Sequence, residues 1–292
     1  MRLGVDLSVH NGYVDMQAVK KSGVDFVIVR DGYGDLLSYP TQKDPRFEQN
    51  YSNAKAAGLH VGTYHYLYAT TAQGARREAE GFLANIKSKQ FDFPIALDIE
   101  ERTQYDLPNA TVEAIVKAFM DVCEAAGYYC ALYSYESFLA SKMSAAFRGK
   151  YDVWCANISR EPSIPYGIWQ YSFTGSVNGC SGRVDMNRTS KDYPQIIKNG
   201  GFNGYPKQAL KELDKPEAAW HKYGDKMYDK DGKINSGLYE VKRRMKEIGY
   251  NYLDLGGGFG GGTEKAVNDL LRLWGYKQNG VIGKNFVDFV MK

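Results

Sequence analysis

Short apolar runs alternate with amphipathic stretches along the first 150 residues of this chain. The apolar runs predict strands over residues 3–7, 26–30, 61–66, 94–100 and 129–133. The stretches that follow them have helical periodicity and predict helices over residues 16–22, 47–57, 75–87, 111–126 and 136–145. Three later apolar runs, 153–156, 168–171 and 183–186, have no helical pattern between them. Repeated strand–helix units are typical of a parallel sheet covered by helices, so we predict an α/β fold, an incomplete (β/α)5β3 TIM-like barrel.

The pattern changes after residue 198. A polar, glycine-rich stretch follows, and apolar residues then recur at helical spacing in three short segments, separated by the turns 256–263 and 279–283. Three short helices of this kind form a domain near the lower size limit for independent folding. We therefore predict a barrel domain at residues 1–198, a linker at 199–236 and a small C-terminal three-helix domain at 237–292.

The composition sets limits on partners and location. The chain is 43% hydrophobic and 24% charged, as in an ordinary globular protein, and its formal net charge is +3. The mild excess of Lys and Arg after residue 205 does not resemble a nucleic-acid patch. No stretch of the sequence is apolar over enough residues to span a membrane. The residues after Met1 show a strand pattern and lack the charged and apolar regions of a signal peptide. We expect no nucleic-acid partner, no membrane insertion and synthesis in the cytoplasm.

The residues that usually bind metals or nucleotides lack the required spacing. The four cysteines do not have ligand spacing and are expected to be free thiols, and the four histidines are scattered. Gly32-Tyr33-Gly34 does not continue into a phosphate-binding fingerprint, and the glycines of 256–262 precede no lysine–serine pair. We therefore expect no metal and no cofactor.

Asp98 and Glu100 are the most informative residues, because acids are rare at the end of a buried apolar run such as 93–97. In a continuous strand, carboxylates at i and i+2 point to the same side, about 7 Å apart. Repulsion and partial burial would push their pKa values apart, so that one acid stays protonated near neutral pH while the other stays charged. Cleavage of a glycosidic bond needs such a pair.

Two further acids are expected at the same end of the barrel. Asp6 ends the first predicted strand and Asp185 lies in the last, and barrel closure makes those two strands neighbours. Both acids would flank Glu100, where they tune pKa values or hold substrate. A structural role at the seam of the barrel is the alternative, above all for Asp6.

Aromatic side chains near the same strand ends are candidates for stacking on the apolar faces of sugar rings. They are Tyr64, Tyr66, Tyr133, Trp154, Trp169 and Tyr171. Strand alternation points Gln170 away from Trp169, so at most one of that pair faces a cleft. Arg30, at the end of the second strand, is a candidate to bind a substrate carboxylate or to pair with a catalytic aspartate.

The order of several short motifs over about 190 residues resembles glycoside hydrolase family 25, the Chalaropsis-type lysozymes. The matching motifs are Gly4-Val5-Asp6-Leu7-Ser8, Phe26-Val27-Ile28-Val29-Arg30, Gly62-Thr63-Tyr64-His65-Tyr66, Ala96-Leu97-Asp98-Ile99-Glu100, Leu132-Tyr133, Val153-Trp154, Trp169-Gln170-Tyr171 and Val184-Asp185-Met186-Asn187. The resemblance implies an endo-acting muramidase, whose partner is bacterial peptidoglycan and whose target is the β-1,4 bond between N-acetylmuramic acid and N-acetylglucosamine.

With this resemblance, Glu100 is expected to be the general acid. Asp98 is expected either to attack the anomeric carbon, or to orient the substrate's 2-acetamido group, or to stabilise the positive charge of the transition state. A chitinase-like glycosidase is an alternative, but that class normally has an acid two residues before Asp98, where this chain has Ala96. A wall-binding protein without catalysis is a second alternative, and the presence of all four acids counts against it.

The C-terminal segment resembles the type 1 peptidoglycan-binding module. The usual turn pattern, Asp-Gly followed by Phe-Gly and Thr, corresponds to 256–263, with Gly256 in place of Asp, and Asn279 replaces the Asp of the second turn. A muramidase joined to such a module without a signal peptide resembles a bacteriophage endolysin. That resemblance implies synthesis in the host cytoplasm and holin-dependent release before the enzyme acts on the cell wall.

Overall fold

The computed structural model describes residues 1–206 and 211–292, and the chain divides into two compact units. The first unit consists of Met1–Ile197 with Phe202–Tyr205, and the second of Lys198–Gly201 with Pro206–Lys292. Each unit has a separate hydrophobic core. The chain is therefore organised as two bodies, each of which buries its own apolar residues.

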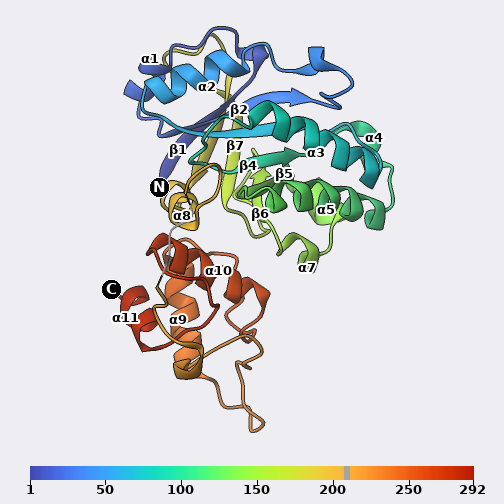
Figure 1. The fold of residues 1–292 in the computed structure, drawn as a ribbon. Helices are drawn as coiled ribbons and strands as arrows, with labels where there is room; N and C mark the ends of the chain where they lie inside the picture. Colours follow the sequence, from blue (N-terminus) through green and yellow to red (C-terminus); the bar gives the residue numbers. More distant parts are fainter. Residues whose placement is uncertain (207–210) are drawn as a thin grey trace. The chain divides into compact units, whose positions relative to one another are not determined.

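The first unit is built around a closed barrel of eight strands (Figure 1). The strands are β1 (Arg2–Leu7), β2 (Phe26–Tyr33), β3 (His60–Tyr66), β4 (Ile95–Asp98), β5 (Cys130–Tyr135), β6 (Asp152–Ala156), β7 (Ile168–Gly175) and β8 (Val184–Thr189). Strands β1 to β7 pair in parallel, whereas β8 is antiparallel to both β7 and β1. The amino end of β8 therefore lies at the same rim as the carboxyl ends of the other strands.

Helices follow each of the first five strands and cover the outside of the barrel. They are α1 (Met16–Lys21), α2 (Phe47–Ala56), α3 (Ala72–Ile86), α4 (Arg102–Tyr105), α5 (Asn109–Ala125), α6 (Glu136–Lys142) and α7 (Ala145–Arg148), with the 3-10 helices η1 (Val9–Asn11) and η2 (Pro40–Gln42). In this fully described part of the chain no helix lies between β6 and β8, and α8 (Tyr193–Gly200) follows the barrel. The α/β class and the eight-stranded barrel agree with the sequence-based prediction.

Helices α3 and α5 pack side by side against the sheet (Figure 1). Phe82 of α3 and Phe119 of α5 stack with their ring centroids 5.9 Å apart, and both side chains are buried. Burial of one such side chain contributes about 1.5–3 kcal/mol to stability. This packing explains why the apolar positions of the two helices recur at helical spacing in the sequence.

Strand β4 ends at Asp98, two residues earlier than predicted. Glu101 begins helix α4 as its N-cap and forms a capping box with Gln104, so that the chain turns between strand and helix. Glu100 lies in this turn and not in the strand. The separation expected for i and i+2 in a continuous strand therefore does not describe Asp98 and Glu100.

The second unit contains the helices α9 (Ser236–Glu247), α10 (Gly261–Leu273) and α11 (Lys284–Val290), and the 3-10 helix η3 (Pro216–Ala218). Its core combines the predicted apolar faces of these helices with residues from the segment that we predicted to be a linker. Met227 is buried in that core and Leu213 packs against it. The compact unit thus begins before residue 237, because isolated apolar residues without periodicity also fold into it.

Three turns of one pattern precede the three helices, at residues 231–235, 256–260 and 279–283. The fourth residue of each turn pairs with the segment 221–228. Ile282 pairs with His221, the Phe259 amide donates to the Asp225 carbonyl at 2.7 Å, and Ile234 pairs with Tyr228. Only the last two turns were predicted from the sequence, because Asp231-Gly232-Lys233-Ile234 lies in the segment predicted to be a linker.

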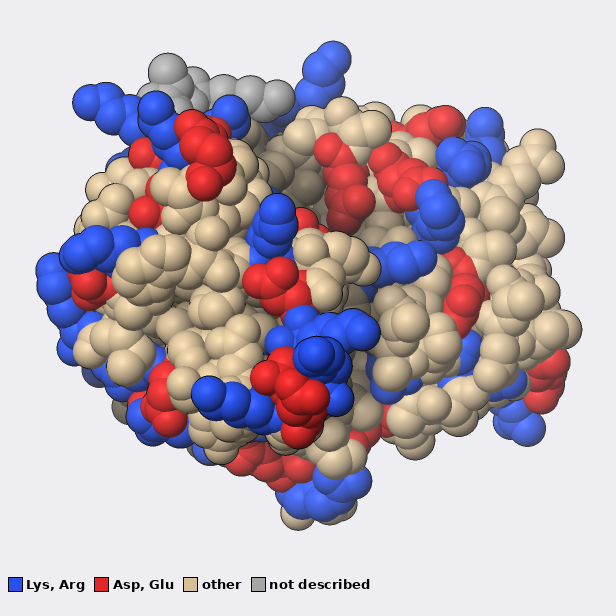
Figure 2. All heavy atoms as spheres, turned by 90° about the horizontal axis from the view of Figure 1, so that it is seen from below, with Lys and Arg blue, Asp and Glu red and all other residues tan. Residues whose placement is uncertain are grey.

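The surface in Figure 2 carries basic and acidic side chains interspersed with neutral ones, and no broad area of a single sign is visible on that face. This mixture fits the small formal net charge of +3. Among the described residues, we find no helix with the length and apolar character needed to cross a membrane.

Candidate active site

Four acidic side chains meet at the rim formed by the carboxyl ends of the parallel strands. Asp6 comes from β1, Asp98 is the last residue of β4, Glu100 follows it in the turn, and Asp185 lies near the amino end of β8. Asp6 and Asp185 are directly paired across β1 and β8. The charges of Asp185 and Glu100 act on Asp6, and those of Glu100 and Asp6 act on Asp98. The structure therefore brings together all four predicted acids.

Burial and mutual repulsion raise the pKa values of these acids. Burial, followed by the charges of Asp185 and Glu101, raises the pKa of Glu100 to about 7. Burial and the charge of Asp185 raise the pKa of Asp6 to about 7, and burial raises that of Asp185. Burial, Glu100 and Asp6 raise the pKa of Asp98 well above its ordinary value. The cluster therefore retains protons near neutral pH, which a general acid requires.

Asp98 and Glu100 each have a buried carboxyl oxygen to which no described residue forms a hydrogen bond, Oδ1 of Asp98 and Oε2 of Glu100. Buried polar atoms are usually paired, and exceptions occur at sites that serve catalysis. These two oxygens belong to the two residues that the sequence singled out. They are free to interact with a group that enters the site.

Asp6 differs from them, because two amide side chains hold it. Its Oδ2 accepts hydrogen bonds from Gln170 Nε2 at 2.8 Å and from Asn187 Nδ2 at 2.7 Å. Gln170 Oε1 accepts from the Tyr133 hydroxyl at 2.7 Å, and Asn187 Oδ1 accepts from Trp154 Nε1 at 2.7 Å. Both amides are thereby oriented so that they donate to Asp6. Donors to the charged form lower a carboxyl pKa, so this network opposes the effect of burial on Asp6.

Three of the predicted aromatic residues form one cluster beside the acids. The rings of Tyr133 and Trp154 lie 4.5 Å apart, and those of Tyr64 and Trp154 lie 6.0 Å apart at a steep angle. Asp6 and Asp98 are among the charges that raise the pKa values of Tyr64 and Tyr133 after burial. These aromatic side chains are therefore neighbours of the acidic cluster.

Tyr66 lies at the edge of the same group of residues. Its hydroxyl donates to Glu101 Oε2 at 3.2 Å, and burial, Glu100 and Asp98 raise its pKa. Glu101 was given no role in the sequence analysis, because strand alternation would point it away from Glu100. It comes near the site because β4 has already ended, and its charge contributes to the raised pKa of Glu100.

Trp169 lies apart from this group. Gln170 pairs with Asn187 across β7 and β8 on the side that faces Asp6, so that alternation points Trp169 the other way. Its Nε1 donates to the Asn157 carbonyl at 2.7 Å, and the guanidinium of Arg188 lies 3.8 Å from its ring centroid. Of this adjacent pair, Gln170 is the residue that contacts the acids.

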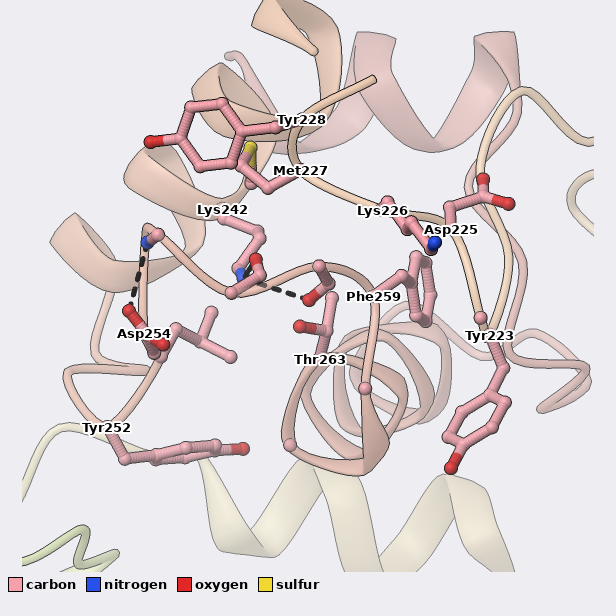
Figure 3. A pocket seen from close by; sticks show the side chains of 17 residues that line it. Tyr223, Asp225, Lys226, Met227, Tyr228, Lys242, Tyr252, Asp254, Phe259 and Thr263 are labelled. Atoms are coloured by element: carbon pink, nitrogen blue, oxygen red, sulfur yellow. Dashed lines mark hydrogen bonds between the residues drawn. The ribbon is translucent and has the colours of Figure 1, made fainter. Parts of the chain in front are cut away.

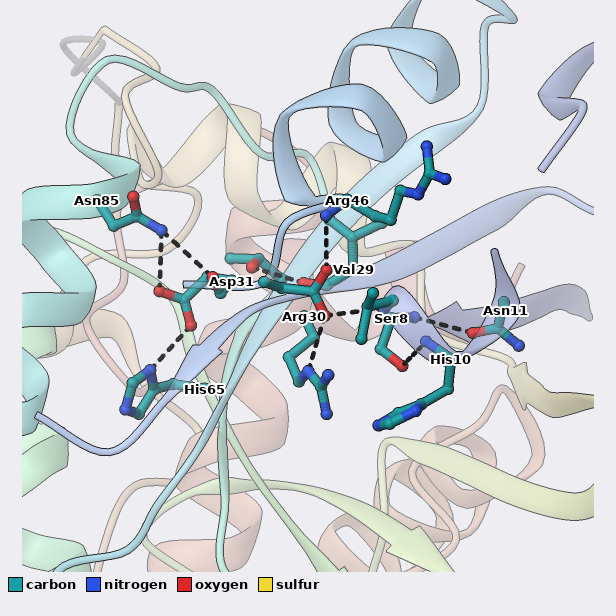
Figure 4. A network of polar contacts seen from close by, with 12 residues as sticks. Ser8, His10, Asn11, Val29, Arg30, Asp31, Arg46, His65 and Asn85 are labelled. Atoms are coloured by element: carbon teal, nitrogen blue, oxygen red, sulfur yellow. Dashed lines mark hydrogen bonds and ion pairs between the residues drawn. The ribbon is translucent and has the colours of Figure 1, made fainter. Parts of the chain in front are cut away.

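Arg30 forms an ion pair with Asp44, Nε to Oδ2 at 2.9 Å, and not with one of the four acids (Figure 4). Asp44 also accepts from the backbone amides of Val9 and Arg46, which fixes the carboxylate in place. The charge of Arg30 still acts on Asp98 and lowers its pKa, against the larger effect of burial. The position of Arg30 is thus set by Asp44, while its charge reaches the site.

Gln170 and Asn187 are the site residues that sequence reasoning missed. Both lie within motifs quoted above, yet neither was given a role. The usable signal was alternation, because a polar residue on the inner side of a barrel strand needs a partner. Within the described residues no group of three or more His, Cys, Asp or Glu side chains is arranged to hold a metal ion.

A family model described as "Glycosyl hydrolases family 25" matches residues 5–180. The chain is 32% identical over 191 residues to the autolytic lysozyme of Clostridium acetobutylicum, a match that covers 64% of this chain and 56% of the relative. It therefore spans about half the length of that relative.

Two solved structures are similar to this fold. The CTP1L endolysin matches with a TM-score of 0.59 and 28% identity over 68% of this chain and 70% of that one. The modular autolysin LytC of Streptococcus pneumoniae, solved with a synthetic peptidoglycan ligand, matches with a TM-score of 0.57 and 26% identity over 64% of this chain and 46% of that one.

Proposed function

The chain belongs to glycosyl hydrolase family 25, and on this premise we propose that it is a lysozyme, an endo-acting N-acetylmuramidase. Its substrate would be bacterial peptidoglycan, cleaved at the β-1,4 bond between N-acetylmuramic acid and N-acetylglucosamine. The main observation in support is the buried, unpartnered carboxyl oxygen of Glu100, whose pKa is raised to about 7, beside the unpartnered oxygen of Asp98.

In this proposal Glu100 enters the reaction protonated and donates its proton to the glycosidic oxygen as the bond from C1 to that oxygen breaks. The Glu100 carboxylate then accepts a proton from the water that attacks C1. Asp98 acts on the positive charge that develops at C1, either by direct attack or by orienting the 2-acetamido group for attack. Asp185 helps to raise the pKa of the proton donor, and Asp6 raises that of Asp98. Tyr64, Tyr133 and Trp154 contact the sugar rings.

We also propose the finer assignments of architecture. The order of strands and helices supports a (β/α)5β3 variant of the TIM-like barrel for the first unit. The three turn–helix segments of the second unit support a role as a wall-binding module of three helices. The similarity to the CTP1L endolysin supports a role as an endolysin. With it we propose host-cell lysis by a phage and holin-dependent release.

Release of sugar reducing ends from purified peptidoglycan tests this function. The wild-type chain should generate reducing ends in proportion to the loss of turbidity, because each hydrolysed glycosidic bond yields one. Glu100→Gln removes the proton and nearly preserves side-chain volume, so activity should fall by at least about a thousandfold. Far-UV circular dichroism should stay unchanged. New amino termini without reducing ends would assign the cleavage to an amide bond and contradict the proposal.

A further inference from the structure

The second unit contains an open pocket of about 720 Å³ (Figure 3). Buried side chains form its base, and they are Met227, Lys242, Leu253, Phe259 and Thr263. Exposed Tyr223 and Tyr228 stand at its rim. One wall comes from the segment 223–228, which lies outside the three helices, and the opposite wall is the glycine-rich turn before α10.

Lys242 brings a buried positive charge to this pocket. The residue is 1% exposed, and its ammonium donates to the carbonyl oxygens of Gly257 and Gly258. No carboxylate of the described chain lies within 4 Å of the ammonium. By contrast, buried Lys191 in the first unit forms an ion pair with Asp152 at 2.9 Å. Two carbonyls use two of the three N–H donors of Lys242, so one donor and the charge remain available to an anion.

The amino end of helix α10 faces the same space. Its N-cap is Gly260, and no side chain caps the first turn, whereas Asn235 caps helix α9. Thr263, in that first turn, is 3% exposed and lines the pocket, and no described residue hydrogen-bonds to its hydroxyl. Uncapped helical N–H groups and a free hydroxyl favour a negatively charged oxygen.

Backbone conformation does not account for the glycines that line the pocket, and packing accounts for only some of them. No glycine of 256–262 adopts a positive φ. A Cβ at Gly260 would meet nothing within 4 Å, and one at Gly262 would come no closer than 3.8 Å to Tyr252. Packing requires glycine at position 258, whose Cβ would lie 2.3 Å from the Asp225 carbonyl oxygen, and a Cβ at Gly257 would lie 2.8 Å from the Asp254 carboxylate. Glycine at the open positions leaves the backbone accessible to a group that approaches from the pocket.

We infer that this pocket binds a carboxylate-bearing peptide, in the wall a peptide stem of peptidoglycan, with the carboxylate between the Lys242 ammonium and the first turn of α10. This inference rests on the proposed wall-binding role of the second unit. The two acidic side chains of the lining each accept a backbone hydrogen bond, Asp254 from the Gly256 amide at 2.9 Å and Asp225 from the Lys222 amide at 3.0 Å. The charge of Asp254 acts on Lys242 without an ion pair between them.

The chemistry of the base favours a peptide over the other wall components. A neutral glycan would add no negative charge beside the buried Lys242 ammonium, on which only the charge of Asp254 acts among the described residues. A phosphodiester of a wall polymer carries one negative charge, as a carboxylate does, but its polyol or sugar units are polar and do not match the apolar base of the pocket. The apolar side chains of Met227, Leu253 and Phe259 suit the small alkyl side chains of a peptide next to its carboxylate.

Calorimetric titration of the full chain tests the inference. The Glu100→Gln background prevents hydrolysis, and the probe is a synthetic stem tetrapeptide with a free C-terminal carboxylate. The same peptide as its C-terminal amide should bind at least about tenfold more weakly, because a charge-assisted hydrogen bond is lost. Lys242→Met should weaken binding of the free acid by a similar factor, and Thr263→Val by about threefold. Lys284→Met, at an exposed lysine of α11 outside the pocket, should leave the affinity unchanged.

Equal affinity for acid and amide, no binding of the peptide, or tighter binding of an N-acetylglucosamine trimer or of inorganic phosphate would overturn the inference. If Lys242→Met fails to fold, the acid–amide comparison and Thr263→Val still decide it. Reducing-end release from soluble glycan fragments by the wild-type chain reports separately on the muramidase. Loss of peptide binding with intact hydrolysis therefore refutes only the pocket, and peptide binding without hydrolysis refutes only the muramidase.

Discussion

Asp6 and Asp185 face each other across the antiparallel pair that closes the barrel, in direct register between β1 and β8. Closure thus sets two carboxyl groups side by side, and their repulsion contributes to the raised pKa of Asp6. Only Asp6 receives the paired amide donors of Gln170 and Asn187. The topology therefore creates the repulsion, and two neutral side chains offset part of its effect on the pKa of Asp6.

Loss of either amide donor should change the pH dependence of the proposed muramidase activity. Gln170→Leu removes a hydrogen bond to the charged form of Asp6, so the pKa of Asp6 should rise above its present value of about 7. A hydrogen bond to a charged group stabilises by about 1.5–3 kcal/mol, which corresponds to roughly one to two pH units. If Asp6 must be charged for activity, the acidic limb of kcat/KM against pH should move upward by that amount.

Asn187→Leu should shift the same limb in the same direction, since it removes the second donor. Gln17→Leu, at a glutamine outside the site, is the matched control and should leave the profile in place. An unchanged acidic limb in both site variants, with the fold intact, would show that the charge of Asp6 does not govern the rate.

Asp98→Asn should stabilise the protein while it abolishes activity. Asp98 is buried with an unpartnered Oδ1, and its pKa is raised well above the ordinary value. A raised carboxyl pKa means that the folded state binds more protons than the unfolded state, so stability falls as pH rises. The neutral amide avoids this loss, and at pH 7 we expect a gain of about 1 kcal/mol or more in urea unfolding.

The control for this prediction is pH itself. Near pH 4 the wild-type carboxyl is protonated in the folded state, so the difference between Asp98→Asn and the wild type should shrink. A gain of equal size at pH 4 and pH 7 would mean that the substitution acts through packing and not through charge.

Much of the architecture follows from sequence periodicity. Buried parallel strands read as apolar runs, and the four acids could be assigned to one rim because they close or border such runs. The end of β4 was not predictable in this way. Glu101 caps α4 and stops the strand at Asp98, and a capping box that directly follows a strand leaves no break in the apolar pattern.

The polar partners inside the barrel were harder to recognise. Alternation shows that Gln170 and Trp169 face opposite sides of β7, but it does not show which of them faces the interior of the barrel. Tryptophan is the residue more usually found in sugar-binding sites, so Trp169 was the natural candidate. Pairing of Gln170 with Asn187 across β7 and β8 decides the question. In the second unit, Met227 and Leu213 are single apolar residues without periodicity, and their burial depends on tertiary contacts that no local pattern records.

His65 should make the stability of the first unit depend on pH above neutrality. Its ring lies between two buried carboxylates. Its Nδ1 is 2.8 Å from Asp31 (Figure 4), and its Nε2 is 3.5 Å from Glu78. Burial acts to lower its pKa, but Asp31 and Glu78 together raise it from 6.5 to about 9. Stabilisation by the charged ring is complete below pH 6.5 and is lost as pH rises through 9. We expect a loss of roughly 3 kcal/mol across this window.

Denaturant unfolding between pH 6 and pH 10 measures this effect. His65→Gln cannot carry the charge, so it should be less stable than the wild type at pH 6, and the difference should narrow toward pH 10. His10→Gln, at an exposed histidine, should follow the wild-type curve. Parallel curves for the wild type and His65→Gln would show that the ring is not charged in the folded state.

The stability of the first unit, when it is produced without the second, should depend on the residue at which the shortened chain ends. Residues 202–205 belong to the first unit, and Asn203 is fully buried there. Its Nδ2 donates to the Phe93 carbonyl at 2.9 Å, and its Oδ1 accepts from the Tyr129 amide at 2.8 Å. A chain that ends at Tyr205 keeps these contacts at the starts of β4 and β5. A chain that ends at Asn199 leaves two buried backbone groups unpaired, and this should cost about 2–5 kcal/mol.

The fragment that ends at Tyr205 should hydrolyse soluble glycan fragments at the rate of the full chain, because all four acids and their partners are retained. It should lyse intact cells more slowly, since a tethered wall-binding unit raises the local concentration of the enzyme on its polymer. The fragment that ends at Asn199 should be the less stable of the two in thermal unfolding. Equal lysis of intact cells by the Tyr205 fragment and the full chain would contradict the proposed targeting role of the second unit. Equal melting temperatures of the two fragments would contradict the structural role of Asn203.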